Sequence, residues 1–446
     1  MHPSINDTIF APATAAGRSG VAVLRISGTQ AAAALAMLGA AIPPPRMATL
    51  AQLRHPETAD VIDQALLLWF PAPASFTGED VAELHVHGSQ AVLKALCTLL
   101  ANLPGLRLAE PGEFARRAFL HGKMDLTEAE GLADLIEAQT EGQLYQAINQ
   151  MQGIMRKRYE AMRAAVIRAL ALLEAYIDFP EEEIPASVID SIDTEMHALA
   201  QTIDGMLADH ARGERIREGI SVVILGAPNA GKSSLINALA QREVAIVAAS
   251  AGTTRDVLEA QVNIGGYAVS LLDTAGLRDA ADEVEKEGIR RARAKALAAD
   301  LTLILLDGSA LPARDAHSLG MITERSVVIL SKADALRGPV PSHIGGVKPL
   351  LLSVKENTGL EELHTAIVTL LDRYYDFRDP PMITRLRHRR TLDETHFHLL
   401  RAMSDLPLEL KCEELRLAAT EIGKMTGKIV TDEILDVVFR EFCIGK

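Results

Sequence analysis

SVVILGAPNAGKSS, at residues 221–234, decides the fold of the domain around it. An apolar run leads into a glycine-rich loop, and helix-forming residues follow, so the stretch predicts a strand, a loop and a helix. The loop from Gly226 to Ser233 fits the pattern GxxxxGK[ST]. Its glycines let backbone N–H groups close around phosphate oxygens, Lys232 adds positive charge, and Ser233 offers a hydroxyl to Mg²⁺. The stretch therefore predicts a site for a nucleoside triphosphate with Mg²⁺.

Two segments downstream of this P-loop suit a γ-phosphate and its metal ion. DTAG at 273–276 ends an apolar strand, so Asp273 is placed to hold Mg²⁺ through water and the backbone around Gly276 can reach the γ-phosphate. AGTTRD at 251–256 supplies Thr254 as the switch threonine that closes on Mg²⁺. The direct Mg²⁺ ligands would then be the P-loop serine and this threonine.

Two later segments favour guanine as the base. SKAD at 331–334 resembles the NKxD motif, in which Asp334 would accept hydrogen bonds from the N1 and N2 groups of guanine. Ser331 stands where asparagine is usual, and we expect its shorter side chain to lose a contact to the base or the P-loop and to weaken nucleotide binding. LLSVKENTG at 351–359 is a plausible final base-side loop. The residues expected to line the GTP site are Asn229, Ala230, Gly231, Lys232, Ser233, Ser234, Ala248, Ala249, Ser250, Ala251, Gly252, Thr253, Thr254, Asp273, Thr274, Ala275, Gly276, Ser331, Lys332, Ala333 and Asp334.

The residue that orients the attacking water is not obvious from the motifs. Many small GTPases place a glutamine directly after DTAG, but this chain has Leu277, whose side chain cannot position water. Arg255 is a candidate arginine finger, although a charged residue in a switch more often has a structural partner. The acids that follow the motif leave five candidates open: Asp279, Asp282, Glu283, Glu285 and Glu287.

The rest of the chain predicts two further kinds of domain. Residues 1–122 alternate apolar strands with helix formers and are expected to form an α+β domain. Residues 123–214 contain long stretches of helix formers, and residues 379–446 return to helical periodicity. Because each helical segment needs a partner for its apolar stripe, we expect the α/β domain at 215–378 to be inserted into one helical domain.

Composition sets the class of protein. The 446-residue chain has a formal net charge of −14, which argues against broad non-specific binding of nucleic acid. Its 3 cysteines are too scattered for a disulfide framework and indicate a reducing cytoplasm. No apolar run reaches about 18 residues, and the N-terminus lacks the regions of a signal peptide, so we expect a soluble protein without a membrane partner.

The last four residues, CIGK, raise the alternative of a prenylated C-terminal cysteine. Gly445 is a poor aliphatic position for such a box, Lys446 is an atypical final residue, and no polybasic segment lies just upstream. A lipid anchor is therefore disfavoured.

The motifs taken together resemble one known family. The P-loop, AGTTRD, DTAGLRDAADEVE and the terminal CIGK closely resemble the MnmE (TrmE) tRNA-modification GTPases. DTIFAPATAAGRSGVAVLRISG, FTGEDVAELHVHG, EPGEFARRAFLHGKMDLTEAE and DFPEEEIP extend the resemblance over essentially the whole chain. It implies an N-terminal folate-binding and dimerisation domain, a discontinuous helical domain and an inserted Ras-like G domain.

The resemblance also implies how GTP is hydrolysed. In the family, K⁺ supplies the positive charge that an arginine finger otherwise would, and G domains dimerise when GTP and K⁺ bind. The K⁺ ligands here would be Asn229, the backbone carbonyls of Ala248 and Ser250, and the hydroxyl of Thr253. Among the five acids, alignment on DTAGL selects Glu285 as the water-orienting residue.

The implied reaction involves partners. The resemblance implies a homodimer that works with the FAD protein MnmG (GidA) on C5 of the wobble uridine of certain tRNAs, taking a one-carbon unit from 5-formyl-tetrahydrofolate or a related folate. FAD would bind only to the partner. The folate contacts would be Arg25, Glu83, Lys123 and Lys446, charges that suit a pterin and glutamate ligand. Cys443 would belong to the tRNA-modification site.

Other interpretations stay open at this point. A ribosome-assembly or signalling GTPase would carry an RNA-binding domain rich in lysine and aromatic residues, and neither flank has that composition. In a second interpretation, the protein is a folate-dependent enzyme and its GTPase activity is only regulatory. His85 and His87 share one strand face and could be metal ligands, although a structural role is more common. RLRHRR at 385–390 could contact tRNA phosphates or form a solvated helix face.

Overall fold

The chain forms two compact units, each assembled from separate segments. The computed structural model describes residues 7–179, 186–243, 259–273, 297–310, 316–336, 338–379, 381–429 and 432–440, together with residues 294, 442 and 445. The expected site residues outside this part of the chain are Ala248, Ala249, Ser250, Ala251, Gly252, Thr253, Thr254, Thr274, Ala275, Gly276, Glu285, Cys443 and Lys446.

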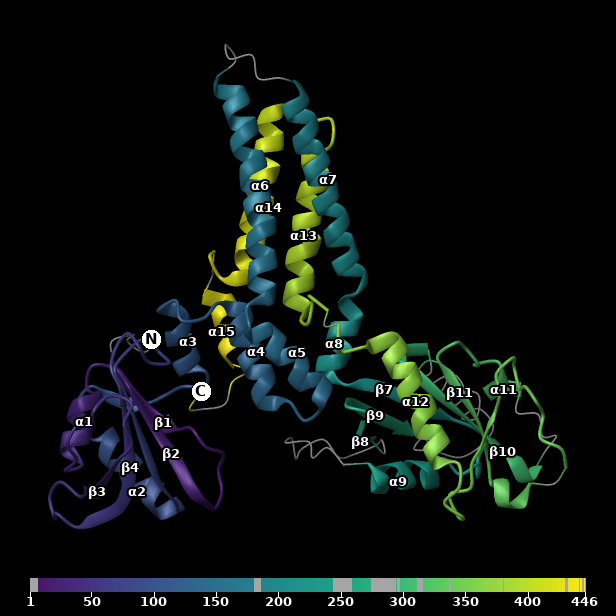
Figure 1. The fold of residues 1–446 in the computed structure, drawn as a ribbon, viewed down its shortest axis with the longest axis horizontal. Helices are drawn as coiled ribbons and strands as arrows, with labels where there is room; N and C mark the ends of the chain where they lie inside the picture. The colour runs from purple at the N-terminus through teal and green to yellow at the C-terminus, as the bar shows by residue number, and fades with distance from the viewer. Residues whose placement is uncertain are drawn as a thin grey trace, which may run out of the picture. The chain divides into compact units, whose positions relative to one another are not determined.

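A six-stranded sheet is the centre of the first unit, which comprises residues 1–133, 150–168 and 419–446. Figure 1 shows this sheet with β1 to β4 labelled. The strand order is β3-β4-β5-β2-β1-β6, and only the β1–β6 pair is parallel. The strands are β1 (Thr8–Pro12), β2 (Ser19–Ser27), β3 (Thr49–Arg54), β4 (Val61–Phe70), β5 (Val81–Gly88) and β6 (Leu106–Leu108). The apolar strands expected within residues 1–122 are thereby confirmed, among them β2, β4 and β5.

Helices α1 (Ala31–Met37) and α2 (Gln90–Ala101) cover one face of this sheet. Phe114 of α3 (Glu113–Leu120) packs with Ile9 and Ala11 of β1 on the other face. Leu35 of α1 packs in one core with Leu24 of β2 and Leu84 of β5. Because successive strand residues point to opposite faces, Arg25 and Glu83 face away from this core.

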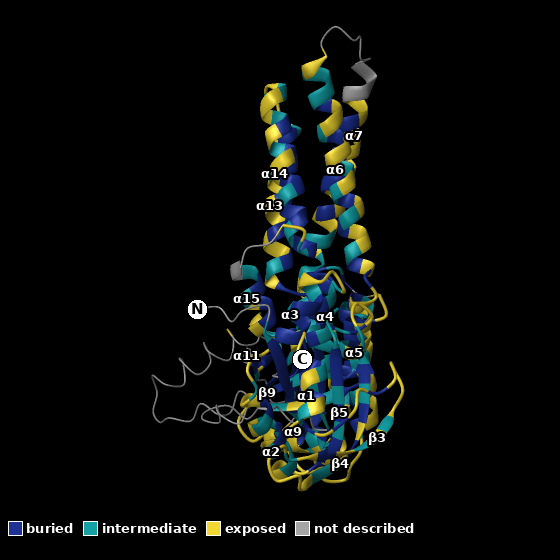
Figure 2. Cartoon of the chain, turned by 90° about the vertical axis from the view of Figure 1, so that its left-hand side faces the viewer, coloured by how far each residue is buried: buried dark blue, intermediate teal, exposed yellow. Residues whose placement is uncertain are grey.

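The helical segments pair with partners that are distant in sequence. They are α4 (Leu126–Glu137), α5 (Glu141–Met151), α6 (Ile154–Asp178), α7 (Ala186–Ala208), α8 (His210–Glu218), α13 (Leu386–Ala402), α14 (Leu408–Thr426) and α15 (Asp432–Arg440). α7 lies against α13 in the second unit. In the same unit, Arg416 of α14 forms an ion pair of 2.7 Å with Glu174 of α6. Figure 2 shows buried and exposed residues alternating along these helices, as expected when each helix packs one face against its neighbours and exposes the other.

This pairing confirms the expected insertion, because helices from both sides of the α/β segment pack together. Among the described residues, no helix combines the length and apolarity needed to span a membrane.

An α/β sheet forms the second part of the second unit, whose residues are 134–149 and 169–418. Its order is β12-β11-β10-β7-β9-β8, and all neighbours are parallel except β8 and β9. The elements are β7 (Ile220–Leu225), α9 (Lys232–Arg242), β8 (Glu259–Ile264), β9 (Tyr267–Asp273), β10 (Leu301–Asp307), η1 (Gly308–Ala310), α11 (Ala316–Leu319), β11 (Ser326–Ser331), η2 (Ala333–Ala335), β12 (Leu350–Leu351) and α12 (Leu360–Tyr375).

Helices cover one face of this sheet and position the candidate site. α9 and α12 bury Leu235 and Leu363 against strand residues such as Val222 and Leu303. A smaller apolar cluster that includes Ile304 covers the other face. Because β7, β9, β10 and β11 run parallel, their carboxyl ends lie at the same edge of the sheet. In α/β proteins this edge is where ligands bind.

The basic run RLRHRR divides between the interior and the surface. Arg385 is buried, and its Nη2 lies 2.7 Å from Asp134 Oδ1. His388 is fully buried, whereas Arg389 and Arg390 are exposed. Two members of the run therefore belong to the helical core, and only its exposed arginines can form a solvated face or contact tRNA phosphates.

Candidate functional site

The P-loop leaves the carboxyl end of β7 and runs into α9 (Figure 1). Gly226 passes so close to β10 that a Cβ atom there would lie 2.3 Å from the carbonyl oxygen of Leu305. Asn229 has a φ of 64°, a left-handed conformation that asparagine adopts more readily than most residues. The loop thus has the close backbone packing and the helix N-terminus that a phosphate cradle requires.

Two side chains at the start of α9 suit a phosphate and its metal ion. Lys232 is buried, and its Nζ donates to the carbonyls of Gly226 at 2.8 Å and Ala227 at 3.0 Å, so the ammonium lies over the loop. Ser233 follows in the first turn and carries the hard oxygen that Mg²⁺ prefers. Asp273 ends β9 opposite Ile224 of β7, at the same edge of the sheet. These positions fit Mg²⁺ and a triphosphate.

Ser331 ties the base-side motif to the P-loop. Its hydroxyl donates to the carbonyl of Ala230 at 2.7 Å, and the carbonyl of Leu306 lies 3.2 Å away. The residue is buried. The expectation that serine loses a contact to the base or the P-loop is therefore wrong for the P-loop, because the shorter side chain still reaches it. The next residue, Lys332, has its Nζ 2.6 Å from Asp307 Oδ2, a partner that the sequence motifs did not identify.

The final base-side loop holds Asp334 in place. Ser353 Oγ donates to Asp334 Oδ1 at 2.7 Å and accepts the N–H of Glu356 at 3.2 Å. The Ser353 hydroxyl lowers the pKa of the Asp334 carboxyl below its ordinary value. Asp334 is therefore an ionised acceptor, which matches the two N–H groups on one edge of guanine. This contact joins the SKAD motif to LLSVKENTG.

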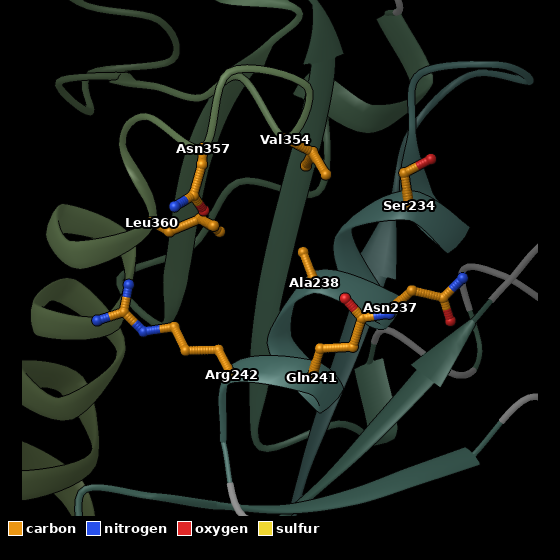
Figure 3. A pocket seen from close by; sticks show the side chains of 8 residues that line it. All are labelled: Ser234, Asn237, Ala238, Gln241, Arg242, Val354, Asn357 and Leu360. Atoms are coloured by element: carbon orange, nitrogen blue, oxygen red, sulfur yellow. The ribbon is translucent and has the colours of Figure 1, made fainter.

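A cavity of about 570 Å³ borders the same loops (Figure 3). Its walls come from one face of α9 and from the start of α12 with the loop before it. The lining residues are Ser234, Asn237, Ala238, Gln241, Arg242, Val354, Asn357 and Leu360. Carboxamides and a guanidinium thus lie beside the expected nucleotide site. Ser234 was predicted from the P-loop, and Val354 and Asn357 lie in the predicted base-side loop, whereas the other lining residues were not predicted.

A second cluster lies on the face of the first unit's sheet that points away from the α1 and α2 core. Arg25 and Glu83 are cross-strand partners, and Arg25 Nη2 lies 2.9 Å from Glu83 Oε1. The Arg25 guanidinium also lies 5.3 Å from the ring centre of Phe76 and 5.7 Å from that of Phe114. Phe76 begins the stretch FTGEDVAELHVHG, but the sequence did not assign it a role of its own. The structure thus brings two of the expected folate contacts together beside aromatic rings.

Lys123 reaches the loop that follows β4. Its Nζ donates to the carbonyl of Pro73 at 2.8 Å, and within the described part of the chain it forms no hydrogen bond or ion pair with Arg25 or Glu83. Phe76, which lies under the Arg25 guanidinium, belongs to the same loop. Lys123 is therefore connected to the Arg25 pair through this loop rather than by direct contact.

The two histidines of β5 have separate carboxylate partners. His85 Nε2 lies 3.4 Å from Glu83 Oε2, and His87 Nδ1 lies 2.7 Å from Asp63 Oδ1. In the described part of the chain, no group of three or more His, Cys, Asp or Glu residues is arranged to hold a metal ion.

Gly445, near the C-terminus, packs against β1 of the first unit. Gly445 is buried with a φ of 97°, and a Cβ atom there would lie 2.0 Å from the carbonyl oxygen of Pro12. The residue before Pro12 is Ala11, the cross-strand partner of Arg25. Gly445 therefore lies near the Arg25 strand, while its neighbours Cys443 and Lys446 lie outside the described residues.

Comparison with known proteins identifies the family. The model described as the GTP-binding protein TrmE N-terminus matches residues 8–123, and the MnmE helical domain model matches residues 126–443. The tRNA modification GTPase MnmE of Parvibaculum lavamentivorans is 49% identical over 445 residues, covering 99% of this chain and 100% of that protein. That of Paramagnetospirillum magneticum is 48% identical over 443 residues with the same coverage. A mitochondrial 5-taurinomethyluridine-[tRNA] synthase subunit, GTPB3 of Danio rerio, is 44% identical over 472 residues, covering 99% and 93%.

These matches confirm the resemblance drawn from the motifs and the expected fold classes of the domains. They also disfavour the ribosome-assembly interpretation, since the N-terminal flank matches a TrmE domain. The chain belongs to the MnmE (TrmE) family of tRNA-modification GTPases.

Proposed function

We propose that this chain is a K⁺-stimulated GTPase whose nucleotide cycle controls modification of C5 of the wobble uridine in certain tRNAs. The observation that carries the GTPase part is the bond from Ser331 to Ala230, because it joins the P-loop and the guanine-reading loop into one site. The modification would add an aminomethyl or carboxymethylaminomethyl group with a folate one-carbon unit. Dimerisation of G domains on GTP binding drives hydrolysis.

The chain's own residues bind and orient GTP. Backbone N–H groups of the P-loop and the Lys232 ammonium hold the β- and γ-phosphates, while Asp334 accepts from the base. Ser233 and Thr254 would hold Mg²⁺, which neutralises negative charge on the phosphates when bound. Glu285 would orient the attacking water.

Asn229 is the described residue that would hold K⁺. It is exposed at the bend of the P-loop and offers a side-chain carbonyl oxygen. Ala248, Ser250 and Thr253 would complete the ligand set. A bound K⁺ supplies positive charge beside the phosphates, which stabilises the charge that develops during phosphoryl transfer.

GTP turnover should therefore depend on the cation. We expect turnover by the purified protein in KCl to exceed that in NaCl by about tenfold or more, because Na⁺ is smaller and fits the same ligands poorly. Asn229→Ala should abolish most of this difference while the protein still binds GDP. Steady-state phosphate release measures both, and equal turnover of the unaltered protein in the two salts would refute the role of K⁺.

The Arg25–Glu83 cluster of the first unit supports a folate site. Arg25, Lys123 and Lys446 would meet the carboxylates, and Glu83 would accept from the amino-pyrimidine edge of the pterin. Phe76 places an aromatic ring beside the Arg25 guanidinium in this cluster. Cys443 would approach the same ligand from the tail that Gly445 anchors. A folate, when bound, would supply the one-carbon unit.

The same sheet face supports a homodimer. Leu50 and Leu66 are cross-strand partners on β3 and β4, and they are 64% and 38% exposed. A second copy that covered this face would bury both apolar side chains and close the folate site. FAD would come from the partner MnmG (GidA), with which the dimer modifies tRNA.

A further inference from the structure

The SKAD loop of this chain has few donors left for a base. Ser331 carries one hydroxyl proton, and both oxygens within reach, those of Ala230 and Leu306, are carbonyl acceptors. The residue is also only 5% exposed. Because a hydroxyl donates one hydrogen bond, the P-loop contact uses the proton that could otherwise reach a base acceptor.

The neighbouring groups of the loop are engaged in the same way. The N–H of Ala333 donates to the carbonyl of Leu352 at 3.0 Å, and that of Ala335 donates to the carbonyl of Lys332 at 2.9 Å. Lys332 Nζ lies 2.6 Å from Asp307 Oδ2, which uses one of the three N–H donors of the ammonium. Asp334 therefore offers a base an acceptor, while the Ser331 hydroxyl offers it no free proton.

Guanine offers two chemically different edges to such a loop. N1–H and the N2 amine are donors and match Asp334, whereas N7 is an acceptor and needs a donor. An asparagine at position 331 would carry two N–H donors and a carbonyl, so it could serve the P-loop and a base acceptor together. A serine can serve only one of them.

We propose that the SKAD loop reads guanine through its donor edge alone, with Ser331 committed to the P-loop and no hydrogen bond to N7. This deepens the proposed function, since it rests on GTP binding at this site. The G domain should then accept purine triphosphates that are altered at position 7 but reject those that lack the N2 amine.

Three nucleotides distinguish these edges in the full-length protein. 7-Deaza-GTP replaces N7 by C–H, and inosine triphosphate lacks the N2 amine. We expect kcat/KM for 7-deaza-GTP to lie within about twofold of that for GTP, and kcat/KM for inosine triphosphate to be about 10- to 100-fold lower, because an acceptor carboxylate then loses a donor.

Ser331→Asn is the matched variant. With two donors at position 331, it should disfavour 7-deaza-GTP by about five- to tenfold relative to GTP. Ser331→Ala should lower kcat/KM for GTP and 7-deaza-GTP alike, leaving their ratio unchanged. Binding of GDP to each variant checks that the site is folded.

The outcomes separate the two proposals. If kcat/KM of the unaltered protein is about tenfold lower for 7-deaza-GTP than for GTP, the proposal that the loop binds only the donor edge is overturned. The proposed GTP hydrolysis would stand in that case. A protein that hydrolyses none of the three nucleotides overturns the proposed GTPase function as well. If only Ser331→Asn fails to fold, the ratio measured with the unaltered protein decides.

Discussion

Glu285→Ala should lower kcat for GTP by about 10²- to 10⁴-fold, which is the range for losing a positioned acid–base group. The reason is that Leu277 leaves no polar side chain directly after DTAG, so the attacking water must be oriented by an acid further along the chain. GDP affinity should change by less than about threefold, because binding comes from the P-loop and Asp334 rather than from this segment. Single-turnover hydrolysis and fluorescence titration measure the two quantities.

Glu283→Ala and Glu287→Ala are the matched controls, since they remove the same charge two residues to either side. Each should retain turnover within about threefold of the unaltered protein. If one of them loses turnover while Glu285→Ala keeps it, the water-orienting role belongs to that residue instead.

Gly445→Ala should reduce tRNA modification by about tenfold or more and leave K⁺-dependent GTP turnover unchanged. The added Cβ would lie 2.0 Å from the carbonyl oxygen of Pro12, on a backbone with a φ of 97°. Because the clash is with main chain, Gly445 must leave its position on Pro12, which would impair the proposed role of the C-terminal residues in modification. The fraction of modified wobble uridine, measured by mass spectrometry of digested tRNA, reports the effect.

Gly346→Ala is the control that adds backbone strain at a glycine without displacing the chain. Gly346 also has a left-handed backbone, with a φ of 82°, but a Cβ atom there would meet nothing within 4 Å. It should therefore leave tRNA modification near the normal level. Unchanged modification in Gly445→Ala would remove the tail from the modification site and leave it a structural anchor.

The phosphate site could be predicted from the sequence because its chemistry lies within one continuous stretch. Gly226, Lys232 and Ser233 have fixed spacing in the motif, and the structure places Gly226 directly after β7 and the other two in the first turn of α9, as expected. The strands β2, β4 and β5 were also predictable, since their apolar residues form continuous or alternating runs.

Contacts between distant segments could not be predicted in this way. The bond from Ser331 to Ala230 spans 101 residues, and the motif gave only the expectation of a lost contact. Arg385 looked like one basic residue in a surface run until the fold brought Asp134 beside it. In the sequence, Gly445 served only as an argument against a prenylation box. Its packing on Pro12 could not be predicted, because it depends on how the helical segments return the chain to the first sheet.

Mass spectrometry of nucleosides from total tRNA of a strain that lacks this gene tests the central claim most directly. We expect the 5-substituted wobble uridine to disappear, to return with the unaltered gene, and to stay absent with Glu285→Ala. A nucleoside profile identical to that of the parent strain would contradict the claim that this GTPase controls tRNA modification.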